Sequence, residues 1–400
     1  MYTLSLLTSS TRRPLGEIRD RFVESGLADS VELYLGRLTD RIGLSLCGPD
    51  DLEKSPAYII SKLGYPDGKT FVEKGIQDHA TSILRSLGSG HGIKCLTTYF
   101  PEITSADSGL REHAINALEV AVRLADKLEV PYVEFVGGRS DEECDHDYTR
   151  AEIERHELQK ADCEIVMSYQ NYVTSDVEHE IPVKAEWLIS GLQKVHDRLT
   201  SRPTDTTVRL LLEMEPGPLF VLSRRHTVNH ILEKTAKCKA HNSDLPFVGL
   251  NCDIGHFMIM TYNQTNPEDV WNQLFRGIGK PSDLIGNFHV SCHPYCRVHL
   301  DNPPTDDPDY RIPQTVEEGF EGQWGVPKDL LPWLNCVLCV SEHRPSGLPA
   351  NLSLELEAAS RDELAVVGLQ SIRKAMDKLI EERDPSVIPP TCECCPQCTP

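Results

Sequence analysis

Short apolar segments alternate with longer amphipathic segments along most of the chain. Apolar runs of this length are typical of strands, and amphipathic stretches are typical of helices. Eight segments are predicted to be strands: Tyr2–Thr8, Ser30–Gly36, Gly92–Phe100, Pro131–Gly137, Thr207–Glu215, Phe247–Asp253, Leu284–Ser291 and Asn351–Glu357. Helical patterns follow most of them: Leu15–Leu27, Phe71–Leu87, Leu110–Leu128, Ala185–Leu199, Thr227–Lys239, Pro267–Gly277, Lys328–Leu338 and Arg361–Glu382. Eight such units predict an α/β fold, with a closed (β/α)8 TIM barrel favoured over an open sheet.

The chain is longer than such a barrel requires. A typical barrel uses about 250 residues, whereas this chain has 400. We assign residues 1–383 to a single barrel and residues 384–400 to a tail rich in Cys and Pro, which we expect to be disordered. The surplus falls in two loop insertions, about 140–183 and 293–325, and each follows a predicted strand. Both would emerge at the C-terminal face, where they form either lids or solvated surface loops.

Charge and composition narrow the classes of partner. Lys and Arg total 40 against 61 for Asp and Glu, which gives a net charge of −21. Nucleic-acid binding depends on Lys and Arg neutralising phosphates, so we expect no nucleic-acid partner and favour a small molecule. No apolar run approaches the roughly 20 residues that span a bilayer, so we expect no membrane association. The 14 cysteines are spread along a chain without an export signal, which predicts reduced thiols and a cytoplasmic protein.

Four of the predicted strands share an unusual polar pattern. One face of each is apolar, and the opposite, inward face ends in an ionisable residue: Glu213, Asp253, His289 or Glu355. Parallel strands are normally apolar on both faces, and buried carboxylates are costly unless they are paired or bound to a metal. The pattern therefore favours one divalent ion, Mn, Mg, Co or Zn, over a metal-free polar mouth of the barrel. In the second strand, Glu32 and Tyr34 share a face, which we expect to extend the same polar interior.

Four motifs resemble those of the xylose isomerase-like TIM-barrel superfamily, which contains sugar phosphate isomerases and epimerases and also endonuclease IV. They occur in the same order, at strands five to eight: Leu212-Glu-Met-Glu-Pro-Gly217, Asn251-Cys-Asp-Ile-Gly-His256, Asn287-Phe-His-Val-Ser291 and Leu354-Glu-Leu-Glu357. The resemblance covers essentially the whole chain in the order and spacing of its βα units.

The resemblance implies a set of metal ligands: Glu213, Asp253, His289 and Glu355. It places His256 beside them, as a group that contacts the substrate or supports a ligand. Glu215 and Glu357 are the alternative ligands, because each shares the inward face with its neighbour. Sugar epimerases of the superfamily carry an arginine within a few residues of the strand-seven histidine, whereas the nearest arginine here, Arg297, lies eight residues on. Arg297, Glu215 and Trp324 are the candidate substrate contacts.

The implied activity is isomerisation or epimerisation of a sugar or sugar phosphate. Proton transfer would pass through an ene-diolate that the ion stabilises, with Glu213 and Glu355 as general base and general acid. His256 would polarise a hydroxyl or orient a ligand. The oligomeric state stays open, a homo-oligomer included.

Three other functions remain open at this point. A barrel of this kind can bind a metabolite without turning it over, or the same groups can expel a β-hydroxyl, as in a lyase or dehydratase. A nuclease of the endonuclease IV type is disfavoured. It needs histidines at the ends of strands two and three, and these strands end in Tyr34-Leu-Gly-Arg37 and Leu96-Thr-Thr-Tyr99.

Overall fold

The structure of the protein is a computed structural model. It describes residues 2–11, 13–36, 76–87, 92–136, 138, 181, 183–201, 207–214, 221–223, 225–240, 244–260, 274–275, 278–291, 330–344, 350–356 and 362–382. The predicted insertion 293–325, nearly all of 140–183 and the tail 384–400 lie outside these ranges. The assignment of residues 1–383 to a single barrel with these loops therefore stays a prediction.

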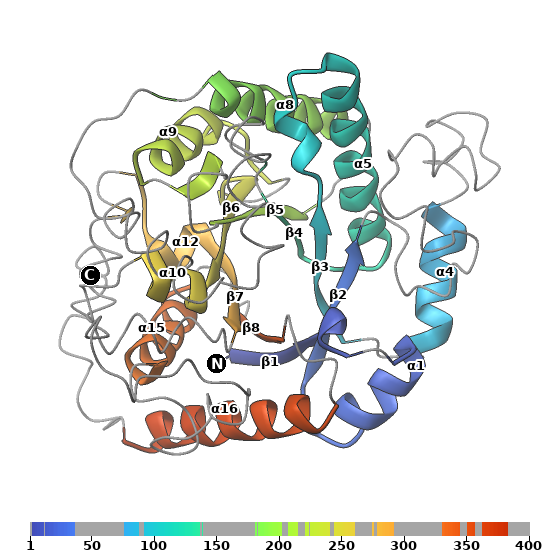
Figure 1. Ribbon diagram of the computed structural model, residues 1–400, viewed down its shortest axis with the longest axis vertical. Helices are drawn as coiled ribbons and strands as arrows, with labels where there is room; N and C mark the ends of the chain where they lie inside the picture. The colour runs from blue at the N-terminus through green and yellow to red at the C-terminus, as the bar shows by residue number, and fades with distance from the viewer. Residues whose placement is uncertain are drawn as a thin grey trace, which may run out of the picture.

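Eight parallel strands form a closed barrel in sequence order. They are β1 (Tyr2–Leu7), β2 (Ser30–Gly36), β3 (Ile93–Tyr99), β4 (Tyr132–Val136), β5 (Arg209–Glu213), β6 (Val248–Asp253), β7 (Ile285–Ser291) and β8 (Ala350–Glu355). The barrel closes where β1 pairs with β8, with Tyr2 opposite Ala350 and Leu6 opposite Leu354 (Figure 1). All eight predicted strands and the predicted (β/α)8 fold are confirmed.

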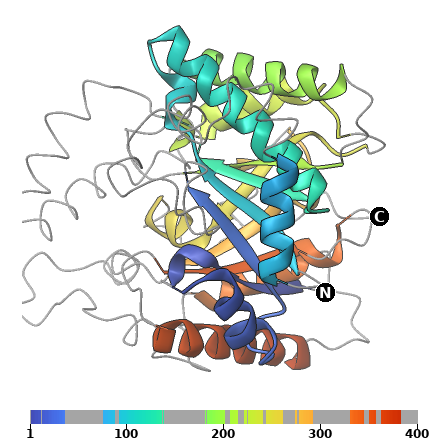
Figure 2. The ribbon, with the colours of Figure 1, turned by 90° about the vertical axis from the view of Figure 1, so that its right-hand side faces the viewer.

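Helices surround the barrel (Figures 1 and 2). The α-helices among the described residues are α1 (Leu15–Ile18), α4 (Ile76–Leu87), α5 (Ser108–Lys127), α8 (Val183–Thr200), α9 (Arg225–Thr235), α10 (Ile254–Met260), α12 (Pro281–Leu284), α15 (Leu330–Glu342) and α16 (Asp362–Glu382). The 3-10 turns are η1 (Thr8–Ser10), η5 (Pro101–Thr104) and η7 (Val221–Ser223), and a π-helical turn, η2 (Arg19–Val23), continues α1. Within the described ranges, no helix is long and apolar enough to cross a membrane.

Two helices were not predicted, and one predicted helix differs from the structure. Helices α10 and α12 are too short to show a helical period in the sequence. The predicted helix over 15–27 is instead a four-residue α-helix followed by a π-helical turn. Most of the predicted helix over 267–277 lies outside the described residues.

Alternation along the strands separates an apolar outer layer from a polar interior. In β8, Leu352 and Leu354 are fully buried on the face toward the helices, and Asn351 and Ser353 are buried on the opposite face. Asn351 donates a hydrogen bond from Nδ2 to Oδ1 of Asn287 in β7, at 2.7 Å. Buried polar groups of this kind need such partners, because an unpaired one costs about 1–3 kcal/mol. The predicted inward orientation of the polar face is thus confirmed.

The N-terminal end of the barrel is closed by two buried arginines. Arg209 donates to the carbonyl oxygens of Pro246 and Asp283 at 2.8 and 2.7 Å. Arg344 donates to the carbonyl oxygen of Ile285 at 2.6 Å and to the Tyr132 hydroxyl. Burial lowers the pKa of Arg209 to about 10. These guanidinium groups therefore fill the N-terminal end of the barrel, opposite the C-terminal ends of the strands.

Most of the described cysteines have the predicted reduced state. Cys95, Cys238, Cys252 and Cys336 are reduced thiols, outside any disulfide. Cys339 departs from the prediction, because it is disulfide-bonded. The expected cytoplasmic location stays a prediction.

Candidate metal centre

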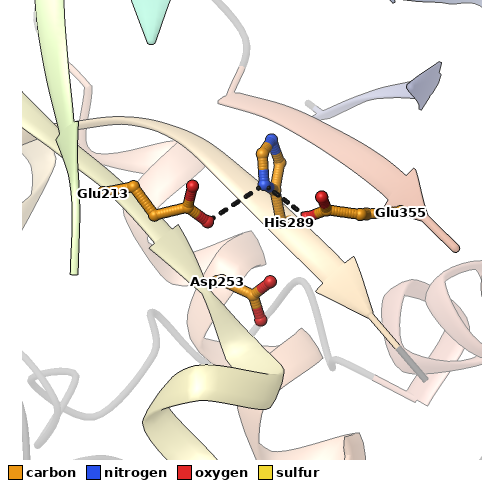
Figure 3. A group of neighbouring side chains, drawn as sticks. All are labelled: Glu213, Asp253, His289 and Glu355. Carbon is orange, nitrogen blue, oxygen red and sulfur yellow. Dashed lines mark ion pairs between the residues drawn. The ribbon is translucent and has the colours of Figure 1, made fainter. Parts of the chain in front are cut away.

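Four consecutive strands bring the predicted ligands together at the C-terminal end of the barrel. Glu213, Asp253 and Glu355 are the last residues of β5, β6 and β8, and His289 lies in β7. The strand register sets Asp253 beside His289 and Ser291 beside Glu355. As a result, one ligand atom from each of the four side chains lies within 4.8 Å of the others (Figure 3).

His289 lies between two of the carboxylates. Its Nδ1 is 2.9 Å from Oε2 of Glu355 and 3.3 Å from Oε1 of Glu213, and these residues lie on opposite sides of the ring (Figure 3). The His289 side chain is 1% exposed and that of Glu213 is 7% exposed, whereas the Glu355 side chain is 20% exposed. Glu355 is therefore the member of this trio that solvent reaches most readily.

Asp253 is oriented by the helix that follows it. It precedes α10, and its Oδ1 accepts a hydrogen bond from the backbone N–H of His256 at 3.0 Å. This is the contact of an N-cap aspartate, which satisfies an otherwise unpaired amide of the first helical turn. The cap contact is made by Oδ1, and Asp253 contributes one carboxylate oxygen to the cluster of four ligand atoms.

The same short helix places His256 beside the cluster, where the sequence motif predicts it. Its Nδ1 lies 3.1 Å from the backbone oxygen of Met214, which makes Nδ1 the donor nitrogen. Its Nε2 lies 3.8 Å from Oδ2 of Asp253. In the neutral ring Nε2, at the edge of the cluster, is then the acceptor nitrogen.

Burial and mutual contacts shift the pKa values of the cluster residues. Burial would lower the pKa of His289, but Glu32 and Glu355 outweigh it and raise this pKa well above its usual value. Burial raises the pKa of Glu355 to about 7 against the opposing effect of His289. For Glu213, contact with His289 outweighs burial and lowers the pKa.

The donor set also fits a divalent ion. Two unit charges of like sign at 4 Å repel by roughly 4 kcal/mol at an effective dielectric constant near 20. Three carboxylates this close are therefore stable together only with a proton or a metal ion among them. Three oxygen ligands with one imidazole are a set that Mn, Mg, Co or Zn accepts.

Two further carboxylates lie deeper in the barrel. Glu32 in β2, Glu134 in β4 and His289 also have ligand atoms within 4.8 Å of one another, and all three are fully buried. Burial would raise the pKa of Glu32, but His289, Thr97 and Asn287 lower it to about 2. Burial, and then the charge of Glu213, raise the pKa of Glu134 well above its usual value. The two carboxyl groups are thus shifted in opposite directions, Glu32 toward the anion and Glu134 toward the neutral acid.

Sequence reasoning placed Glu32 in the polar interior but missed Glu134 altogether. The available signal was a glutamate in the middle of the apolar run Tyr132–Val136, because a central parallel strand is normally apolar on both faces. Glu215, Glu357, Arg297 and Trp324 lie outside the described residues, and their predicted roles stay predictions.

Solved structures share this architecture. A D-tagatose 3-epimerase-like protein aligns with 95% of this chain and 99% of its own, at a TM-score of 0.50 and 12% identity. An L-ribulose 3-epimerase aligns with 96% of this chain and 97% of its own, at a TM-score of 0.49 and 12% identity. The IolI protein, with a bound zinc atom, aligns with 96% of this chain and 99% of its own, at a TM-score of 0.46 and 15% identity. No family model and no curated protein matches the sequence. The first alignment confirms the resemblance at the level of the fold.

Proposed function

We propose that the protein is a metal-dependent isomerase or epimerase of a sugar or sugar phosphate, and that it moves a proton next to a carbonyl. The observation that carries the proposal is the cluster of Glu213, Asp253, His289 and Glu355 at the C-terminal end of four adjacent strands. Active sites of (β/α)8 barrels are built at this end. The fold is also that of a D-tagatose 3-epimerase-like protein, which supports this reaction class by analogy.

The proposed ligands are these same four residues, and the ion is Mn, Mg, Co or Zn. When bound, such an ion polarises a carbonyl oxygen and stabilises the negative charge that develops on it. The chain itself supplies the groups that move the proton. Glu213 and Glu355 lie on opposite sides of His289 (Figure 3), so they would flank a substrate bound between them.

The two carboxyl groups act as a general base and a general acid. One carboxylate takes the proton from the carbon next to the carbonyl, and the electron pair of the broken C–H bond moves onto the carbonyl oxygen. Return of a proton to the same carbon from the opposite carboxyl group inverts its configuration, which is epimerisation. Return to the neighbouring carbon, with transfer between the oxygens, is isomerisation. Neither route consumes an oxidant or a reductant.

His256 is proposed to bind a hydroxyl of the substrate. Its Nδ1 donates to the Met214 carbonyl, which in the neutral ring makes Nε2, at the edge of the cluster, the nitrogen that can accept from such a hydroxyl. Glu355 is the more exposed of the two proposed proton carriers, so an entering substrate would meet it before Glu213.

The test is metal analysis followed by proton exchange. Protein purified without chelator should contain one equivalent of divalent ion, and the double variant Glu213→Gln/Glu355→Gln should lose it. The matched control is Glu381→Gln/Glu382→Gln, two glutamates at the exposed end of α16, which should keep the ion. The loaded protein should then exchange a carbon-bound proton of a ketose or ketose phosphate with deuterated solvent. No ion in the wild type, even after incubation with Mn, Co, Mg or Zn, would leave a metabolite-binding barrel as the better account.

A further inference from the structure

The nitrogen of His289 that faces away from the proposed ligands has a partner of its own. Nε2 lies 3.0 Å from Oε1 of Glu32, which comes from β2, on the other side of the barrel. Both side chains are inaccessible to solvent, at 1% and 0% exposure. The imidazole ring therefore lies between two sets of carboxylates, with Nδ1 facing Glu213 and Glu355 and Nε2 facing Glu32.

The Glu32 carboxylate is held in place by other donors. The amide Nδ2 of Asn287 lies 3.1 Å from both of its oxygens. The hydroxyl of Thr97 in β3 donates to Oε1. These contacts come from neutral groups on two other strands, so the carboxylate has little freedom to turn away from the ring.

We propose that Glu32 is a positioning residue of the metal centre: it accepts the Nε2–H of His289 and so presents the unprotonated Nδ1 to the ion. A neutral imidazole has one donor and one acceptor nitrogen, so a proton kept on Nε2 leaves the lone pair on Nδ1. A carboxylate behind a metal-bound histidine also fixes the ring and raises its basicity. This inference rests on the proposed function and adds a residue outside its ligand set.

A second ion between Glu32, Glu134 and His289 is the competing interpretation, since their ligand atoms lie within 4.8 Å of one another. Two observations favour the positioning role. The Asn287 amide and the Thr97 hydroxyl donate hydrogen bonds to Glu32. A cation bound at this carboxylate would be repelled by the partial positive charge on these hydrogens. A second ion would also need a lone pair on Nε2 at the same time as one on Nδ1.

The variant that tests the inference is Glu32→Gln, which keeps the size of the side chain and removes its charge. With Mn as the probe, we expect the Kd of this variant to rise about 10–100-fold, the effect typical of losing such a partner. The matched control is Thr235→Val. Thr235 is a buried polar residue of the outer helix α9, and its hydroxyl donates to the carbonyl oxygen of Ile231 at 2.8 Å. Its Kd for Mn should stay at the wild-type value, and circular dichroism checks that both variants are folded.

A second measurement is made on the wild-type protein, with His289→Asn used only for signal assignment, and it remains available if Glu32→Gln does not fold. Histidines labelled with nitrogen-15 are observed in the protein loaded with cadmium-113, and the His289 signals are assigned by their loss in His289→Asn. We expect a metal–nitrogen coupling at Nδ1 and a bound proton at Nε2. A proton at Nδ1 with the metal at Nε2 would overturn the inference.

The outcomes separate this inference from the proposed function. A wild type that binds one ion, with an unchanged Kd in folded Glu32→Gln, would overturn the positioning role and leave the proposed function standing. Two ions in the wild type, one of them lost in Glu32→Gln, would replace the positioning role with a second ion site. A wild type that binds no ion would overturn both.

Discussion

The carboxylate of Glu355 and the imidazole of His289 approach to 2.9 Å because adjacent strands β8 and β7 set Ser291 beside Glu355. Glu213 reaches the other side of the same imidazole from β5. The centre therefore depends on the register of parallel strands, and its properties can be tested with single substitutions that leave this register intact.

Asp253 should show separable effects on metal binding and on stability. Asp253→Asn keeps a good N-cap for α10 but replaces a carboxylate ligand with an amide, so the Mn affinity should fall at least about 10-fold while the metal-free protein stays at least as stable. Asp253→Ala should lose the same affinity and, in addition, about 1 kcal/mol of unfolding free energy. Urea unfolding and Mn titration measure the two effects.

The control for Asp253 is Asp107, the N-cap of α5, which accepts from the amides of Gly109 and Leu110 far from the cluster. Asp107→Ala should lose a similar stability, about 1 kcal/mol, with no change in Mn affinity. Equal stability of Asp253→Asn and Asp253→Ala would contradict the capping role.

Metal affinity should fall as the pH is lowered. In the metal-free protein the pKa of His289 is raised well above its usual value and that of Glu355 is raised to about 7. Below these values both groups hold protons that the ion must displace, and above them the competition disappears. The Kd for Mn should therefore rise at least about tenfold for each pH unit below 7. Titrations at several pH values measure it, and a Kd that is constant between about pH 6 and pH 8 would refute the prediction.

The ion should stabilise the fold, because it relieves the repulsion among Glu213, Asp253 and Glu355. At a free concentration 100 times the Kd, binding to the native state alone adds about 2.7 kcal/mol. The Tm should rise on addition of Mn and fall again with EDTA. In Glu213→Gln/Glu355→Gln, Mn should leave the Tm unchanged; a shift equal to that of the wild type would place the ion elsewhere.

Gly249 should be essential to the closed N-terminal end of the barrel. A Cβ atom at this position would lie 2.3 Å from the backbone oxygen of Leu284 and 2.7 Å from Nη2 of Arg209. Gly249→Ala should therefore cost about 1–3 kcal/mol of unfolding free energy. At Gly16 the nearest atom to such a Cβ is 3.5 Å away, so Gly16→Ala should be neutral or stabilising in its helix. Chemical denaturation of both variants provides the comparison.

Much of the fold and of the candidate site was predictable from local patterns. Apolar runs at βα spacing indicated all eight strands, because a buried strand requires a short run of apolar residues and each βα unit repeats that run. The four ligand candidates were predictable because each ends an inward face, as Glu355 does opposite the buried leucines of β8. Once a barrel closes, such strand ends must meet.

Other features depend on contacts between strands that are far apart in the sequence, and the pattern of a single segment does not indicate such contacts. The contact between Glu32 and His289 joins β2 to β7 and arises only when the barrel closes. Glu134 was missed because one glutamate in an apolar strand does not reveal that Glu213 will lie beside it and raise its pKa. Helix α10 depends on the Asp253 cap rather than on a helical period. The sequence by itself thus determined which side chains face the interior, through the two-residue period of a strand. Only the tertiary structure decided which of them touch and how their charges balance, because those properties depend on pairs of strands far apart in the chain.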